Sequence, residues 1–436
     1  MNRFGYLTIA SLGYAILAVT PLLIGLAPPR PAGRAFLVEL SIALGFIAFA
    51  QMGLQLGLIG RFQRMSRPLG IDLVMQYHRQ IGILALVVVV AHPVLLILHQ
   101  PAYLQFLNPF GGTLASRTGV FSILALIVLT VTSVWRKQLR IGYEAWRVTH
   151  ALLGIGAILL AQIHIYLLGV FANAPWKQGA LALWSLVFIG LIVWLRLVKP
   201  VTLRRRSWQV LEVLPEAPTT WTVVLEPRGH DGFRFAPGQF AWIKIGNPWS
   251  VDEHPFSFSS SAERPDRLEL GIKELGDFTN RIGEVEPGTP VYIDGPHGSF
   301  SSDFQPADGF LFIAGGIGIS PILSMLRTLA DRSDRRSHVL VYACSRWSRT
   351  AFRDELGRLS ARLDLKMVYV FEEPHEGWTG ASGYVDGEIL APLLRRDQSQ
   401  HVLMCGPDAM MTAVEKALYE QGVPDRRIHM ERFNLV

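Results

Sequence analysis

The sequence predicts a multidomain membrane protein. We expect an all-α bundle of six transmembrane helices over residues 1–199, an antiparallel β-barrel over 200–306, and an α/β domain with a parallel sheet over 307–436. Half of the 436 residues are hydrophobic and only 17% are charged, against about 25% in an average soluble domain. Six long apolar stretches precede Pro200, and short alternating segments with frequent turns follow it.

The first half is expected to cross the membrane six times. A helix needs about 20 apolar residues to cross about 30 Å of hydrocarbon, and most of the stretches reach that length. The expected spans are residues 4–27, 35–58, 78–98, 119–135, 147–170 and 179–198. Loops and flanks on one side carry 13 Lys and Arg, against 4 on the other. The positive-inside rule therefore places both termini in the cytoplasm, with the inner (plasma) membrane expected for a bacterial protein.

The net charge of +6 is divided unevenly along the chain. Residues 1–199 carry 15 Lys and Arg against 3 Asp and Glu, a balance of +12, which leaves −6 for the rest. The basic excess lies in the apolar half, where membrane topology explains it, so a nucleic-acid partner is not expected. Two cysteines are too few for a disulfide framework or a four-cysteine iron–sulfur cluster.

Histidines recur with equal spacing in the third and fifth apolar stretches. His78 and His92 are 14 residues apart, and so are His150 and His164. Fourteen residues fall about 40° short of four helical turns, so each pair shares a helix face, with about 21 Å between its members along the axis. Because the two stretches run in the same direction, the pairs His78/His150 and His92/His164 each lie at one depth. We predict two stacked haems with these four ligands; histidines hydrogen-bonded between helices are the alternative.

Two textures in the second half predict its two domains. Period-two segments such as FAWIKIG and RLELGIKEL continue to about residue 305 and predict the antiparallel barrel. From residue 309, strand-like and helix-like runs alternate, which predicts a parallel sheet flanked by helices. The turn Gly315-Gly316-Ile317-Gly318-Ile319-Ser320-Pro321 lies between such a strand and a helix. Glycines there let the backbone and the helix N-terminus approach a diphosphate.

Further motifs accompany this turn, and Glu431-Arg432-Phe433 follow them. They are Pro237-Gly238-Gln239-Phe240, His254-Pro255-Phe256-Ser257, Gly295-Pro296-His297-Gly298 and Cys405-Gly406-Pro407. In this order they make residues 200–436 resemble a ferredoxin–NADP reductase module, with an FAD-binding barrel and an NAD(P)-binding domain. The segment HPFSFSS resembles the NADPH oxidase and ferric reductase branch. With the histidine pairs, almost the whole chain resembles a transmembrane ferric reductase/NADPH oxidase-like flavocytochrome b.

The resemblance implies roles in holding FAD. Phe256 would stack on the isoalloxazine, Ser257 would bond near flavin N5, and His254, after which Pro255 follows, would face the ribityl phosphate. Lys273 and the turn Asp277-Phe278-Thr279 would hold the FAD pyrophosphate, and Phe433 would cover the flavin. Taken alone, Phe256 would most often be a core residue.

The resemblance also implies a nucleotide site and a site of hydride transfer. Residues expected to contact the nucleotide are Gly315, Gly316, Gly318, Pro321, Ser345, Arg346, Cys405, Gly406 and Pro407. Arg346 suits a 2′-phosphate and favours NADPH over NADH. Ser257, Cys405 and Glu431 would line the hydride-transfer site, although a lone Cys405 also suits a small buried apolar position.

The activity implied is an NAD(P)H-dependent oxidoreductase. Electrons from cytoplasmic NADPH (or NADH) would pass through FAD and two b-type haems to an acceptor across the membrane, such as a ferric chelate or oxygen. NADPH oxidases have a His where this chain has Leu96 and an Arg in the second span, which is absent here, and this argues against dedicated superoxide production. The alternatives are a donor subunit for a periplasmic redox protein or a quinone, and a membrane-anchored flavoreductase without haem.

Overall fold

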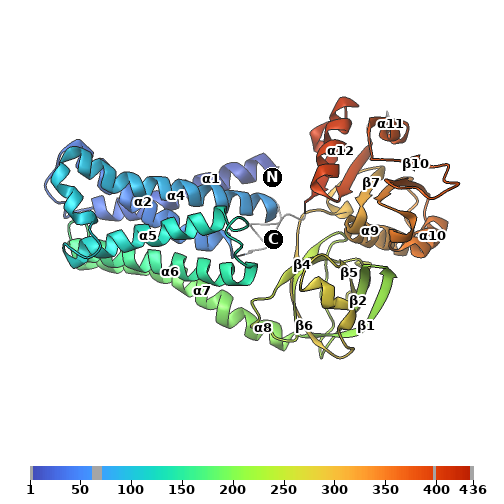
Figure 1. The fold of residues 1–436 in the computed structure, drawn as a ribbon, viewed down its shortest axis with the longest axis horizontal. Helices are drawn as coiled ribbons and strands as arrows, with labels where there is room; N and C mark the ends of the chain where they lie inside the picture. Colours follow the sequence, from blue (N-terminus) through green and yellow to red (C-terminus); the bar gives the residue numbers. More distant parts are fainter. Residues whose placement is uncertain (1–2, 61–70, 396–398, 433–436) are drawn as a thin grey trace. The chain divides into compact units, whose positions relative to one another are not determined.

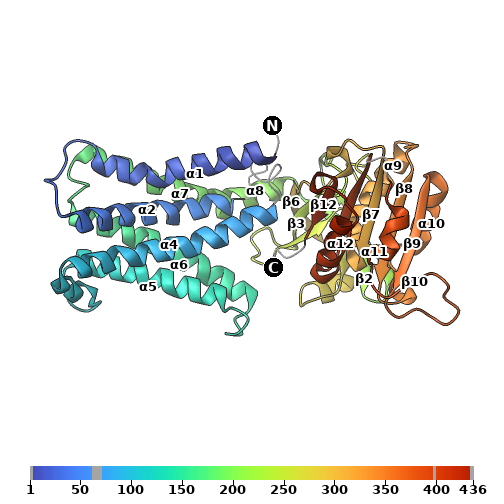
Figure 2. The ribbon, with the colours of Figure 1, turned by 90° about the horizontal axis from the view of Figure 1, so that it is seen from above.

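The computed structural model describes residues 3–60, 71–395 and 399–432, and the chain divides into two compact units, 1–199 and 200–436. In the first unit, long helices run side by side in both views (Figure 1, Figure 2). They are α1 (Arg3–Leu26), α2 (Phe36–Leu58), α4 (Ile71–His99), α5 (Leu114–Val134), α6 (Tyr143–Leu168) and α7 (Pro175–Val193). Among the described residues, six helices are long and apolar enough to cross a membrane, which confirms the six predicted spans. The chain is an integral membrane protein.

Helices α4 and α6 begin before the predicted apolar spans. Helix α4 begins seven residues before the expected start at residue 78, and α6 begins four residues before residue 147. Their added turns carry polar residues such as Gln76 and Glu144, which hydropathy excludes from a membrane span although they continue the helix. Helix α7 continues through one π turn, Trp194–Val198, into α8 (Lys199–Arg205), and η1 (Pro101–Leu107) connects α4 to α5.

The core of the bundle lies where α2, α4, α5 and α6 meet. Ala48 of α2 and Ala157 of α6 are completely buried there, together with Val89 and Leu126. Small side chains allow helices to approach closely in lipid, where no hydrophobic force draws them together. Ser122 of α5 donates a hydrogen bond of 2.8 Å to the carbonyl of Ala157, which joins α5 to α6.

The second unit begins with an antiparallel sheet of six strands in the order β4-β3-β6-β1-β2-β5. The strands are β1 (Trp208–Ala217), β2 (Thr220–Pro227), β3 (Phe240–Ile245), β4 (His254–Ser257), β5 (Leu268–Lys273) and β6 (Pro290–His297). A bridge between Phe258 and Leu270 connects the two ends of this order, so the sheet closes into the predicted barrel. Two short helices lie beside it, η3 (Thr279–Glu284) and η4 (Ser302–Phe304).

A parallel sheet follows, in the order β10-β9-β8-β7-β11-β12. Its strands are β7 (Gly309–Gly315), β8 (His338–Cys344), β9 (Leu365–Phe371), β10 (Ala381–Ser382), β11 (Gln400–Cys405) and β12 (Ile428–Glu431). Its helices are α9 (Ile319–Asp331), α10 (Arg353–Arg362), α11 (Gly387–Leu390) and α12 (Asp408–Glu420). Short 3-10 helices are η5 (Gly316–Gly318), η6 (Trp347–Arg349), η7 (Ala391–Leu393) and η8 (Asp425–Arg427).

Both faces of the parallel sheet are covered, which explains its nearly continuous apolar strands. Phe310, Phe312 and Ala314 of β7 pack on the side of α9 and α10, whereas Leu311 and Ile313 pack on the side of α11 and α12. The fold class predicted from the sequence, a helical bundle followed by an antiparallel barrel and a parallel α/β domain, is therefore confirmed.

Candidate functional site

The four predicted haem ligands meet as two pairs inside the helical bundle. The ring centroids of His78 on α4 and His150 on α6 are 6.2 Å apart, and those of His92 and His164 are 6.4 Å apart. A first-row metal binds an imidazole nitrogen at about 2 Å, so two rings on opposite sides of one ion have centroids about 6.3 Å apart. Each pair therefore has room for one metal ion between its two rings.

The Nδ1 atoms in these pairs are occupied by hydrogen bonds. Nδ1 of His92 lies 2.8 Å from the carbonyl oxygen of Ser41, and Nδ1 of His164 lies 2.7 Å from that of Ala115. A carbonyl only accepts, so Nδ1 must carry the proton in both rings and Nε2 keeps a free lone pair. This is the arrangement of a metal-binding histidine, whose second nitrogen donates to a backbone or side-chain oxygen.

The His78/His150 pair is held by side chains instead. Nδ1 of His150 lies 3.0 Å from the hydroxyl of Ser133, and Nδ1 of His78 accepts a hydrogen bond of 2.6 Å from the side-chain amide nitrogen of Gln55. The Ser133 hydroxyl donates to the carbonyl of Leu129, so its oxygen accepts the Nδ1 proton of His150 and leaves Nε2 of that ring free. Within the described residues, no group of three or more His, Cys, Asp or Glu could hold a metal. Two protein ligands for each ion fit an iron whose other ligands come from a porphyrin, and they do not fit a four-ligand zinc site.

Glycines bring two neighbouring helices against these rings. A Cβ atom on Gly45 of α2 would lie 3.3 Å from Nδ1 of His92, and a Cβ atom on Gly119 of α5 would lie 2.7 Å from Nδ1 of His164. The close approach places the carbonyls of α2 and α5 within reach of the rings. Sequence reasoning missed Ser41, Ala115, Ser133, Gln55 and these glycines, since no spacing rule connects them to the histidines.

The predicted flavin residues gather around strand β4. His254 is held by Asp252, whose carboxylate oxygen is 2.7 Å from its Nε2, and its ring lies 4.5 Å from that of Phe278 between centroids. The ring of Phe256 is stacked on that of Phe278, with 6.0 Å between the centroids. The three half-buried rings form an aromatic group suited to a planar ring system. Phe278 was expected in the turn that holds the pyrophosphate, and not beside the flavin ring.

The other predicted flavin residues lie at the barrel edge. Ser257 is buried, with 5% of its surface exposed, and Lys273 is exposed at the end of β5. The hydroxyl of Thr279 accepts hydrogen bonds from the backbone N–H groups of Leu275 and Gly276, at 2.8 and 3.0 Å, so it shapes the turn after β5. Phe433 lies outside the described residues.

The glycine-rich turn after β7 interlocks with the turn after β11. A Cβ on Gly318 would lie 2.1 Å from the carbonyl oxygen of Cys405, and a Cβ on Gly315 would lie 2.7 Å from Pro407. Gly406 in turn packs on the backbone of Gly315. Only glycine allows this contact. Pro321 is buried in the first turn of α9.

Gly316 is the open position of this turn. It has a φ of +52°, and nothing lies within 4 Å of the position of a Cβ, so the side of the turn where a side chain would stand is open. Burial raises the pKa of the neighbouring Cys344 thiol above its ordinary value. The thiol therefore stays protonated near neutral pH and adds no negative charge beside a bound diphosphate.

Two of the three residues expected to line the hydride-transfer site lie on adjacent strands. Cys405 and Glu431 are register partners on β11 and β12. The thiol of Cys405 is fully buried in the core beside α9, a small apolar position of the kind that a lone cysteine suits. Glu431 is 8% exposed, and its carboxylate lies 3.3 Å from the position of a Cβ on Gly298 of the barrel. Glu431 thus reaches the barrel, whereas the Cys405 side chain does not point into open space.

Arg346, the predicted 2′-phosphate ligand, is already paired. Its Nε lies 2.9 Å from a carboxylate oxygen of Glu373, and both side chains are more than half exposed. The backbone N–H of Glu373 donates to the carbonyl of Ser345 at 2.9 Å, which joins the ends of β8 and β9. The ring of Trp347 follows, with the guanidinium of Arg353 at 4.7 Å from its centroid. Glu373 and Trp347 were not predicted as site residues, because their partners lie far away in the sequence.

Comparison with known families covers both units. Residues 44–161 match a ferric reductase like transmembrane component, residues 222–301 match an FAD-binding domain, and residues 312–416 match an oxidoreductase NAD-binding domain. The three matches, in this order, give the chain the ferric reductase/NADPH oxidase-like architecture. The transmembrane match contains three of the four paired histidines and ends three residues before His164.

Known reductases are similar to about half of this ferric reductase-like chain. The stachydrine N-demethylase reductase subunit of Rhizobium meliloti (strain 1021) is 30% identical over 50% of this chain and 64% of its own length. The probable dihydroorotate dehydrogenase B (NAD(+)) electron transfer subunit of Methanopyrus kandleri is 32% identical over 47% of this chain and 71% of its own length.

Two further comparisons complete this picture. The glycine betaine monooxygenase reductase subunit of Pseudomonas aeruginosa (strain UCBPP-PA14) is 29% identical over 46% of this chain and 57% of its own length. The chain thus spans less than two thirds of the length of the first relatives. Among solved structures, the FAD/NAD-binding domain of a nitric oxide dioxygenase from Vibrio cholerae is similar, with a TM-score of 0.47 and 23% identity over 52% of this chain and 98% of that domain.

Proposed function

We propose that this ferric reductase-like protein transfers electrons from NAD(P)H across the membrane to an acceptor on the opposite face. The observation that supports this most is the geometry of the two histidine pairs, with ring separations of 6.2 and 6.4 Å and a hydrogen-bonded Nδ1 in each ring. When bound, FAD would supply the conversion of a hydride into single electrons, and two b-type haems would supply one-electron carriers within the hydrocarbon.

The role of the helices is to hold two sites at separate depths. The histidines of one helix lie about 21 Å apart along the axis, which is most of the about 30 Å of hydrocarbon. His78 and His150 would hold one haem and His92 and His164 the other. The oxygen partners of Nδ1 in His92, His164 and His150 would leave Nε2 to bind the iron, and so orient these rings before the metal binds.

The barrel and the α/β domain would hold the flavin and the nucleotide. The rings of Phe256 and Phe278 offer a surface for the isoalloxazine, beside Ser257. Gly315, Gly316 and Gly318 bring the backbone close to a diphosphate at the N-terminus of α9. NADPH or NADH is the donor; the Arg346–Glu373 pair must open for a 2′-phosphate to bind, so Glu373 weakens the preference for NADPH that Arg346 alone suggests.

The acceptor and the topology complete the proposal. A ferric chelate or oxygen is reduced on the face opposite the reductase module; reduction of a quinone or a periplasmic redox protein is the second possibility. Both termini would lie in the cytoplasm, as the distribution of Lys and Arg indicates, and the membrane would be the inner (plasma) membrane of a bacterium. An anchored flavoreductase without haem would have no use for two matched histidine pairs.

A reduced-minus-oxidised spectrum of detergent-purified protein tests this function. We expect two b-type haems per FAD, reduced anaerobically by NAD(P)H and reoxidised by ferric citrate or oxygen. His92→Ala should lose one haem, whereas the control His99→Ala, at the exposed end of α4, should keep both. Haem that dithionite reduces but NAD(P)H does not, or the absence of haem, would overturn the proposal.

In proteoliposomes, NAD(P)H added outside should reduce an acceptor trapped inside only when the module faces outward. Turnover with ferric citrate or oxygen, compared with turnover on added quinone or on periplasmic extract fractions, separates the proposed acceptors. A rate with small acceptors far below that with a protein acceptor would favour the donor-subunit alternative.

A further inference from the structure

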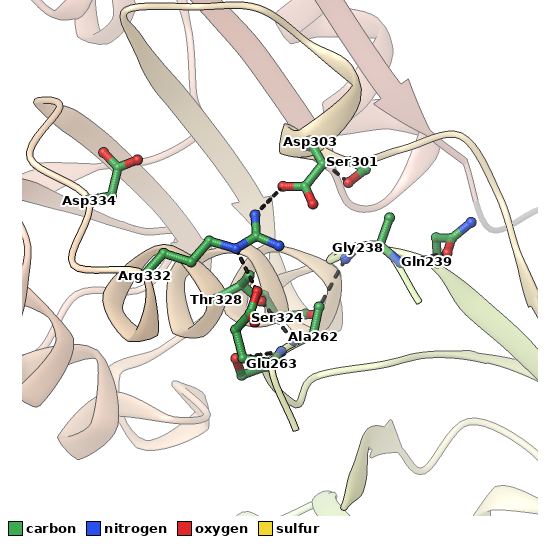
Figure 3. Close-up of polar contacts among 12 residues, drawn as sticks. Gly238, Gln239, Ala262, Glu263, Ser301, Asp303, Ser324, Thr328, Arg332 and Asp334 are labelled. Carbon is green, nitrogen blue, oxygen red and sulfur yellow. Dashed lines mark hydrogen bonds and ion pairs between the residues drawn. The ribbon is translucent and has the colours of Figure 1, made fainter. Parts of the chain in front are cut away.

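One face of helix α9 is bonded to the flavin barrel along its whole length. The residues on this face are spaced by four, and therefore form a single stripe along the helix: Ser320, Ser324, Thr328 and Arg332. Ser324 donates a hydrogen bond of 2.7 Å to the carbonyl of Ser260, and the hydroxyl of Thr328 accepts one of 2.9 Å from the backbone N–H of Ala262 (Figure 3).

The two ends of the stripe also contact the barrel. At the first turn, the hydroxyl of Ser320 donates to the carbonyl of Gly271 at 3.2 Å. Beyond the last turn, Figure 3 shows Arg332 between two acidic residues of the barrel unit, Glu263 at 2.6 Å and Asp303 at 2.7 Å. These last ion pairs are exposed and contribute little on their own.

Arg327 lies beside the stripe and is the most enclosed charge of this interface, with 15% of its side chain exposed. Its guanidinium donates to the carbonyl of Ser259 at 2.9 Å and to the carboxylate of Glu269 on β5 at 2.6 Å. The same group bonds Glu355 of α10 through Nε at 2.6 Å. A single planar group thus joins the barrel, α9 and α10, which a lysine could not do.

The barrel approaches α9 so closely that side chains are excluded. A Cβ on Gly238 or on Gly271 would lie 2.3 Å from Met325 or Ser320 of α9. The same helix begins directly after Gly318 of the nucleotide turn. The position of α9 on the barrel therefore sets the position of the nucleotide turn relative to β4 and its flavin residues.

We propose that Arg327 is a positioning residue for hydride transfer, which sets the distance between the nicotinamide and the flavin by holding α9 on the barrel. The inference rests on the proposed function. In that reaction a hydride passes from the dihydronicotinamide to the flavin, and Arg327 exchanges neither electrons nor a proton. A displacement of about 1 Å between reacting groups lowers such a rate about 100-fold, which is why the residue matters at a distance from the chemistry.

Stopped-flow reduction of the flavin in the full-length protein tests the proposal. Arg327→Met should lower the limiting rate of flavin reduction by about 30- to 100-fold, with FAD content unchanged and the Kd for NAD(P)H altered less than about threefold. Arg327→Lys, which cannot bridge both carboxylates, should restore only part of the rate. The control Arg332→Met, on the same helix but with exposed ion pairs, should stay within about threefold of the wild type.

Hydrogen exchange gives a readout that does not depend on turnover. The backbone amide of Ala262, bonded to Thr328, should exchange about tenfold faster in Arg327→Met and remain unchanged in Arg332→Met. A wild-type rate in Arg327→Met, or a loss that only follows lost FAD, would overturn the positioning role. If Arg327→Met does not fold, Glu355→Gln decides, since it removes one bond of Arg327 and must slow flavin reduction at constant FAD content. If NAD(P)H does not reduce the flavin of the wild-type protein, the proposed function is refuted. The exchange experiment would still report whether Arg327 holds α9 on the barrel.

Discussion

Gly119→Ala provides a sharp test of the histidine pairs. The new methyl carbon would lie 2.7 Å from Nδ1 and 2.9 Å from Cε1 of His164, whereas ordinary contact begins at 3.4 Å. The ring or helix α5 must therefore shift by about 0.7 Å, against a tolerance of about 0.2 Å for a metal–nitrogen bond. A shift of the ring away from α5 would also lengthen the hydrogen bond from His164 to the carbonyl of Ala115, because Ala115 lies on the same helix as residue 119.

Two effects of the substitution can be separated. Alanine is favoured over glycine in a helix by about 1 kcal/mol, so the change should not unfold α5. The matched control is Gly45→Ala on α2, whose methyl would lie 3.3 Å from the ring of His92, about 0.1 Å inside ordinary contact. The two variants have the same chemistry and differ only in how far a ring must move.

The assay is the ratio of haem to FAD in purified protein, from the pyridine haemochrome and the released flavin. We expect about one haem per FAD for Gly119→Ala and about two for Gly45→Ala, because only the first displaces its ring beyond the tolerance of the bond. Retention of two haems with an unchanged spectrum in Gly119→Ala would refute the assignment of His164 as an iron ligand in this geometry.

Three further predictions follow from individual contacts. Ser133→Ala removes the hydroxyl 3.0 Å from Nδ1 of His150 and should weaken haem retention at that site by about 10- to 100-fold, measured by haem loss on dilution. Glu373→Gln frees Arg346 and should raise the affinity for 2′,5′-ADP relative to 5′-ADP by up to about fivefold in calorimetry; an unchanged ratio would exclude Glu373 as a competitor for the phosphate. Burial lowers the pKa of His338 below its ordinary 6.5. As the pH falls through 6.5, this histidine therefore binds a proton in the unfolded chain before it does so in the folded one, and the free energy of unfolding decreases. The temperature of flavin release should therefore drop below that pH, and His338→Gln should flatten the drop.

Much of the fold could be predicted because its signals are local. Hydropathy located the spans, and the helical period placed His78 and His92 on one face of α4. The first residues of the spans were predicted less accurately, since α4 begins among polar residues that a membrane span excludes. Strand alternation and the Gly315–Pro321 turn likewise depend on neighbours within a few residues, and they led to the barrel and the parallel sheet.

The environment of the site was decided by tertiary structure. His92 finds its hydrogen-bond acceptor at Ser41, 51 residues away, and Arg346 meets Glu373 across the ends of two strands. The thiol of Cys405 packs in the core because β11 turns that side chain toward α9.

The physical reason for this division is the range of the interactions. The sequence by itself determined which residues share a helix face or strand end, because backbone periodicity repeats every two or 3.6 residues. It also determined that His78 and His150 belong at one depth. Tertiary packing alone decided that their rings stand 6.2 Å apart, and that Arg327 joins α9 to the barrel. Such contacts connect segments whose distance in space depends on every helix and strand between them.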